Sequence, residues 1–140
     1  MTKCELNANS NGQGITEAAL QRFSQIFSRR QLGDIHEQQA KRRLQQAGLE
    51  FVESNFNCKF GEIDLIFRDS SSQLLVFVEV RYRKSDTFGG AAASVSKSKQ
   101  EKIKKSALFY VSQRKLAPNM RFDVVAIEGE QFNWIQSAFS

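Results

Sequence analysis

The sequence FGEIDLIF at residues 60–67 is followed by VFVEVR at residues 76–81, and both stretches place acidic side chains among apolar residues typical of buried β-strands. Alternate side chains share a face of a strand, so Ile63 and Leu65 are expected on one face and Asp64 on the other. By the same alternation, Glu79 and Arg81 share a face of the second strand. A buried carboxylate without a partner costs several kcal/mol, so both acids need a partner.

Two partners would explain these carboxylates. A hard divalent cation is held in proteins by one or two carboxylates, together with water and substrate phosphate. Alternatively, Asp64 or Glu79 forms an ion pair with Arg81 or Arg83, since structural ion pairs also occupy such positions. Two acids and a base at this spacing favour a functional site.

Five ordered motifs carry a family resemblance: GEIDLI (61–66), FVEVRYR (77–83), FG (88–89), KQ (99–100) and RFDVV (121–125). They resemble the YraN family of small, uncharacterised bacterial proteins, which is similar in fold to the PD-(D/E)XK nucleases and to archaeal Holliday junction resolvases. The resemblance covers residues from 33 to the end of the chain. It implies an α/β, restriction-endonuclease-like αβββαβ core, with a central mixed sheet flanked by helices.

Periodicity and turn residues predict the same order of elements: helix, three strands, helix, two strands. The expected ranges are a helix from Asp34 to Gly48, strands at 51–57, 62–68 and 74–82, a helix from Ser98 to Arg114, a strand at 121–127, and a last strand or tail that contains Phe132 and Trp134. Asp34 and Glu37 have capping-box spacing, as do Ser98 and Glu101. Glu37 also falls on the helix face that packs against the sheet, so a capping role and a site role both stay open.

Length and composition indicate one folded domain. The chain has 140 residues, 41% of them hydrophobic, including twelve Phe. Residues 1–32 are expected to form an N-terminal extension with a short amphipathic helix from Thr16, and residues 33–140 the endonuclease-like domain. The two cysteines, Cys4 and Cys58, lack the spacing of a metal site. We therefore expect reduced thiols and a cytoplasmic location. Because no apolar run approaches the ~20 residues that span a bilayer, we expect no membrane partner.

Positive charge is concentrated near the carboxylates. From Arg81 to Lys105 there are eight basic residues and two acidic ones, a net charge of +6, whereas the whole chain carries +5. A local basic field beside two acids suits a polyanion whose phosphates approach a metal site. A solvated, lysine-rich helix face is the alternative explanation.

The resemblance also implies roles for individual residues. Asp64 and Glu79 would hold Mg²⁺ or Mn²⁺, with Glu37 contributing through water. The family pattern usually has lysine two residues after the second acid, whereas this chain has Arg81, which can clamp a phosphate but cannot act as a base. Lys99 is the candidate for a relocated lysine. The predicted catalytic residues are Asp64, Glu79, Arg81 and Lys99, and the predicted nucleic-acid-binding residues are Arg81, Arg83, Lys84, Lys97, Lys99 and Lys102.

The sequence therefore predicts a nucleic-acid-binding protein that acts as a metal-dependent endonuclease. Its substrate would be DNA, including branched DNA, whose phosphodiester bonds it hydrolyses. A resolvase-like function would favour a homodimer. The alternatives are a non-catalytic nucleic-acid-binding module on the same fold and a protein-interaction scaffold.

Overall fold

The computed structural model describes residues 29–83, 95–116 and 118–140. Its contacts divide the chain into two units, Met1–Leu32 and Gly33–Ser140, and the second unit carries all the described strands. The helix expected from Thr16 and the predicted phosphate-binding Lys84 lie outside the described residues.

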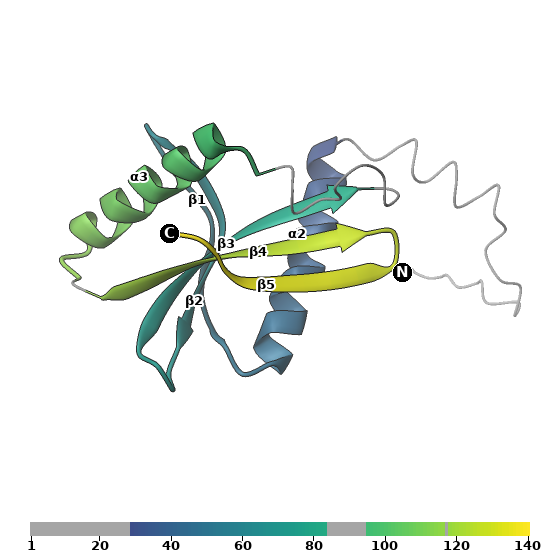
Figure 1. Ribbon diagram of the computed structural model, residues 1–140, viewed down its shortest axis with the longest axis horizontal. Coiled ribbons are helices and arrows are strands. Elements are labelled where there is room, and N and C mark those ends of the chain that lie inside the picture. The colour runs from purple at the N-terminus through teal and green to yellow at the C-terminus, as the bar shows by residue number, and fades with distance from the viewer. Residues whose placement is uncertain (1–28, 84–94, 117) are drawn as a thin grey trace, which may run out of the picture. The chain divides into compact units, whose positions relative to one another are not determined.

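The described elements occur in the predicted order of helix, three strands, helix and two strands (Figure 1). Their bounds are α2 Arg29–Gln46, β1 Glu50–Cys58, β2 Gly61–Asp69, β3 Leu74–Arg83, α3 Lys97–Gln113, β4 Asn119–Glu128 and β5 Gln131–Phe139. The four strands whose ends were predicted are each longer than expected, by one or two residues at one or both ends.

The strands form one mixed sheet in the order β1-β2-β3-β4-β5. β2 and β3 form the expected antiparallel hairpin, whereas β3 and β4 are parallel. Parallel neighbours need a long crossover connection, and the segment that contains α3 supplies it. The result is an α/β fold compatible with a restriction-endonuclease-like core.

Two hydrophobic clusters, built with different helices, pack against the sheet. The α3-side cluster contains Phe56, Ile63, Ile66, Leu75, Phe77, Val95, Ile103, Ala107, Tyr110, Val111, Phe122 and Val124. The α2-side cluster contains Ala40, Leu44, Leu49, Leu65, Phe67, Val76, Val78, Val125 and Ile127. Along β3 the two sets alternate strictly, as expected of a strand buried on both faces. The sheet is therefore the middle layer between α2 and α3.

Strand β2 departs from regular alternation. The expectation that Ile63 and Leu65 share a face is wrong, because Ile63 belongs to the α3-side cluster and Leu65 to the α2-side cluster. Pairing between β2 and β3 extends only as far as Leu65, which lies opposite Val78. Since β3 no longer holds the backbone beyond that pair, β2 can change its facing at Asp64.

Both helices begin earlier than the sequence predicts. Because α2 starts at Arg29, Asp34 lies within the helix, and a capping role for Glu37 is excluded. The N-cap of α3 is Ser96, whose hydroxyl accepts the backbone N–H of Lys99 at 3.2 Å, so the expected Ser98 cap is wrong. The carboxylate of Glu101 instead pairs with Lys104 at 2.8 Å.

A buried acid joins the last two strands. The sequence predicts a structural ion pair for Asp123 with Arg121 or Arg83, and the partner is Arg121, which donates two hydrogen bonds of 2.9 Å. The fully buried Asp123 carboxylate also accepts the indole N–H of Trp134 at 2.9 Å and the backbone N–H of Ser137 at 3.0 Å. Four hydrogen bonds thus satisfy this carboxylate, which ties β5 to β4.

Both edge strands are irregular. The register of β1 against β2 shifts between Phe51 and Glu53, and the register of β5 against β4 shifts between Phe122 and Val124.

Within residues 29–83, 95–116 and 118–140, no helix is long and apolar enough to cross a membrane.

Replacing Asp123 by Asn should lower the free energy of unfolding by about 3 kcal/mol, because it removes the charge that faces Arg121 and loses acceptor capacity in a buried site. Urea denaturation measures this loss. Asp69→Asn is the matched control, since the Asp69 carboxylate also faces Arg121, at 3.6 Å, but at the surface. Equal losses in the two variants would contradict a special role for Asp123.

Candidate active site

The two predicted acids meet where β2 and β3 separate. Asp64 lies one residue beyond the last β2–β3 pair, Leu65 with Val78. Its Oδ2 atom accepts the backbone N–H of Val80 at 2.8 Å, so a side chain takes the place of a strand-to-strand backbone bond. Glu79 directly precedes Val80 on β3. Both carboxylates are buried, with 8% of Asp64 and 4% of Glu79 exposed.

Two cations flank Glu79. Arg81 comes from the same strand, with its Nη1 atom 3.6 Å from Glu79 Oε2, and Lys99 comes from the first turn of α3, with its Nζ atom 3.7 Å from the same oxygen. The Arg81 and Lys99 side chains are about one third exposed. The second oxygen of Glu79, Oε1, is buried and has no hydrogen-bond partner among the described residues. The Glu79 and Asp64 carboxyl groups also lie within hydrogen-bond reach of each other, a contact that requires a shared proton or a cation between them.

Burial shifts both carboxyl groups toward their neutral forms. The pKa of Glu79 rises to about 8, mainly because burial penalises the charged form and also because Asp64 is a nearby like charge; Lys99 and Arg81 oppose the rise. Burial likewise raises the pKa of Asp64, against the opposing effects of the Val80 N–H and Lys99. A divalent cation between the two groups would favour their ionised forms.

Glu37 lies at the margin of this pair. Its pKa rises to about 7, first through burial and then through the charge of Asp64, while a hydrogen bond with Asn55 opposes the rise. The described residues nevertheless contain no group of three or more His, Cys, Asp or Glu side chains arranged to hold a metal ion. Asp64 and Glu79 therefore form the core of the candidate site, and Glu37 faces it as a neighbouring charge.

The other predicted cations that the structure describes are exposed. Arg83 is exposed at the end of β3, and Lys97 and Lys102 are exposed on α3. Lys99, by contrast, reaches the carboxylates, as its helical position relative to Ile103 suggests. The structure thus brings together Asp64, Glu79, Arg81 and Lys99, and leaves Lys97 and Lys102 at the surface.

The sequence does not reveal a contact between His36 and Tyr82. His36 has no partner at metal-ligand spacing, so the sequence favours a surface residue over a metal ligand, and it predicts no stacking partner. The histidine is half-buried, and its ring stacks on Tyr82 with centroids 3.7 Å apart. The only available signal was adjacency, because His36 precedes Glu37 and Tyr82 follows Arg81.

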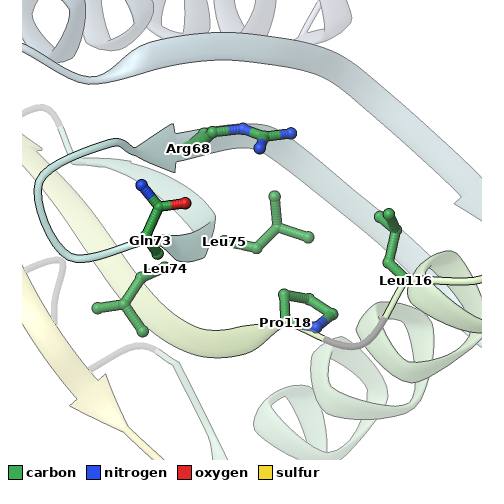
Figure 2. Close-up of a pocket in the computed structure, with 6 residues that line it drawn as sticks. All are labelled: Arg68, Gln73, Leu74, Leu75, Leu116 and Pro118. Carbon is green, nitrogen blue, oxygen red and sulfur yellow. The ribbon is translucent and has the colours of Figure 1, made fainter.

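A pocket of about 270 Å³ lies at the other end of the β2–β3 hairpin (Figure 2). Its lining residues are Arg68, Gln73, Leu74, Leu75, Leu116 and Pro118. Arg68 pairs with Leu75 across the hairpin, several residues from the point where the strands separate. Because this lining contains no carboxylate, the pocket lacks the acidic chemistry found at Asp64 and Glu79.

Asp64 and Glu79 suit a hard divalent cation. Carboxylate oxygens are the ligands that Mg²⁺ and Mn²⁺ prefer, and these ions usually complete their coordination with water and phosphate. Glu79 Oε1 is a buried acceptor with no hydrogen-bond partner among the described residues, and a cation would satisfy it. The two carboxylates therefore fit a site that needs only two protein ligands.

Sequence comparisons relate this chain to known proteins. The model of the uncharacterised protein family UPF0102 matches residues 36–127, a range that contains all the residues of the core site. A UPF0102 protein of Vibrio campbellii is 48% identical over 120 residues, covering 82% of this chain and 97% of the relative. UPF0102 proteins of Pectobacterium carotovorum and Aeromonas hydrophila are each 45% identical, covering 81% and 91% of this chain and 98% and 99% of the relatives.

The raised pKa of Glu79 predicts a pH dependence of stability. Its carboxyl group favours the folded state fully below its ordinary pKa of 4.5, and this contribution is lost as pH rises to about 8. Glu79→Gln removes the titrating group, so we expect the variant to gain stability over the wild type as pH rises, on the order of 3 kcal/mol at pH 9. Urea denaturation in a chelator at several pH values measures this.

Glu130→Gln is the control, because Glu130 is exposed in the β4–β5 turn. Its stability should follow the wild type at every pH. A constant difference between Glu79→Gln and the wild type, independent of pH, would contradict the buried charge at Glu79.

Proposed function

The chain belongs to the uncharacterised protein family UPF0102, and on that premise we propose that it is a nucleic-acid-binding protein that acts as a metal-dependent endonuclease. The reaction is hydrolysis of phosphodiester bonds in DNA. Asp64 and Glu79 hold Mg²⁺ or Mn²⁺, and Arg81 and Lys99 bind the phosphate that is cut.

One observation carries this proposal: two buried carboxyl groups with raised pKa values lie within hydrogen-bond reach of each other on neighbouring strands, and two cations flank Glu79. A purely structural ion pair would be expected to use both oxygens of Glu79. The shortest contacts of the two cations, 3.6 Å and 3.7 Å, both go to Oε2 and are longer than a charge-assisted hydrogen bond. The arrangement is better suited to a metal and a phosphate than to a closed ion pair.

When bound, the metal supplies a positive charge for the scissile phosphate and lowers the pKa of an attacking water. The protein residues then have separate tasks. Asp64 is fixed by the Val80 N–H, so its other oxygen keeps one orientation. Arg81 clamps phosphate oxygens through its planar guanidinium group. Lys99, from the other side of Glu79, stabilises negative charge that develops on the phosphate.

The flanking cations extend the binding surface. Arg83, Lys97 and Lys102 are exposed beside the core and would neutralise neighbouring phosphates, as would Lys84. The relatives come from bacteria, whose DNA lies in the cytoplasm, so the proposal includes a cytoplasmic location. Symmetric cutting of branched DNA would require two copies of the chain, which a homodimer provides.

One observation favours a second candidate, a non-catalytic nucleic-acid-binding module. Arg81 occupies the position where the resembled nucleases usually carry lysine, and an arginine stays protonated and cannot act as a base. The buried acids weigh against this candidate, because carboxylates beside a phosphate repel it unless a cation lies between them.

Cleavage of labelled single strands, duplexes, flaps and four-way junctions tests the proposal. In Mg²⁺ or Mn²⁺ the wild type should cut at least one of these substrates, and Glu79→Gln should cut it at least about 100-fold more slowly, because one metal ligand is lost. The control is Glu50→Gln. Glu50 is the first residue of β1 and lies opposite Arg68, near the β2–β3 turn, so this variant should cut as the wild type does.

Binding measured in the same reactions separates the two candidates. If the wild type binds without cutting while Arg81→Lys cuts, the arginine has silenced a nuclease scaffold, and the non-catalytic module is correct. If the wild type binds no nucleic acid at low salt, both candidates are wrong.

A further inference from the structure

An exposed aromatic stack lies near the carboxylate pair, at the end of β3. The rings of Tyr82 and His36 are nearly parallel, with an interplanar angle of 15° and centroids 3.7 Å apart. Tyr82 lies on β3, three residues after Glu79, and His36 lies on α2 directly before Glu37. Tyr82 is nevertheless 43% exposed, and it belongs to neither hydrophobic cluster. A large ring therefore faces solvent on the α2 side of β3, the face opposite Glu79 and Arg81, without contributing to the core.

The same ring borders a hollow lined by basic groups. Val80, Arg81, Tyr82 and Arg83 border a shallow, open hollow of about 320 Å³ at the end of β3. Its lining combines one aromatic ring with two guanidinium groups, and guanidinium groups bind phosphate oxygens bidentately.

An exposed aromatic ring whose sequence neighbours bind phosphate can stack on a nucleic-acid base. Nucleic-acid bases stack on exposed aromatic side chains whatever their sequence, while a basic groove follows the backbone. Tyr82 lies roughly 10 Å along β3 from Glu79 but on the other face of the strand. A nucleic-acid strand would reach both residues around the edge of β3 that β2 leaves unpaired beyond Val78. His36 covers one face of the Tyr82 ring, so the stack is ordered before a base arrives.

We infer that the Tyr82–His36 stack receives an unpaired base next to the phosphate held at Asp64 and Glu79, an inference that rests on the proposed function. In a continuous duplex, neighbouring bases cover both faces of every base, and extruding one costs stacking and pairing energy. A base in a single strand, a flap or a junction branch point is already free. The substrate class is therefore nucleic acid with an unpaired nucleotide at the cutting site.

Binding of two matched probes tests this inference. One probe is a short DNA single strand with 2-aminopurine, whose fluorescence falls on stacking, and the other is a blunt duplex of the same sequence. Both are titrated at low salt in Ca²⁺, which replaces Mg²⁺ so that binding is measured without relying on cleavage. Tyr82→Leu should weaken single-strand binding about tenfold and abolish the quenching, while duplex binding changes less than about twofold.

Two further variants serve as controls. Tyr82→Phe keeps the ring and should retain both affinity and quenching. Leu116→Ala alters a residue with the same exposed fraction, 43%, at the far end of the hairpin, and it should bind both probes as the wild type does.

The outcomes separate this inference from the proposed function. If Tyr82→Leu binds and quenches the single strand as the wild type does, the stacking inference is wrong while nucleic-acid binding stands. If Tyr82→Leu weakens both probes equally, the ring serves general binding and the preference for an unpaired base is overturned. If the wild type binds neither probe, the proposed function fails, and this inference fails with it.

Discussion

The hydrogen bond from the Val80 N–H to Asp64 Oδ2 is the constraint on which the candidate site depends. Within a sheet, a backbone N–H normally bonds to the neighbouring strand, and a buried one without a partner is costly. Here a carboxylate takes that role where β2 and β3 stop pairing. The strands can separate without leaving the Val80 N–H unsatisfied, and the same contact fixes Asp64 beside Glu79.

Stability and chemistry make opposite demands at this point. Burial raises the pKa values of Asp64, Glu79 and Glu37, so without a bound cation their ionised forms destabilise the fold. Elsewhere the fold satisfies a buried acid completely, since the Asp123 carboxylate accepts four hydrogen bonds. Glu79 lies in the same sheet, but its Oε1 atom has no hydrogen-bond partner among the described residues. Such an unbalanced group is typical of functional sites, where proteins tolerate a loss of stability.

Much of the fold could be predicted from the sequence, because burial imposes a simple period on strands. The alternation along β3 correctly placed Glu79 and Arg81 on one face, and helical spacing correctly brought Lys99 toward the sheet. The failures occurred where local rules compete or contacts are distant in sequence. Ile63 lies on the α3 side because β2 loses its pairing with β3 beyond Leu65. The N-cap of α3 is Ser96 rather than Ser98. The Asp123–Trp134 and His36–Tyr82 contacts depend on tertiary packing that no local pattern encodes.

The register shifts of the edge strands have a consequence for self-association. A regular edge strand offers an unbroken row of backbone donors and acceptors, on which another copy can extend the sheet and start aggregation. Among the described strands, β1 and β5 are the two edges; each pairs irregularly with its neighbour, and left-handed backbone occurs in both, at Asn55 and Ser137. These irregularities interrupt the row of backbone donors and acceptors that another strand would need. Copies of this domain should therefore meet through side chains rather than by joining their sheets.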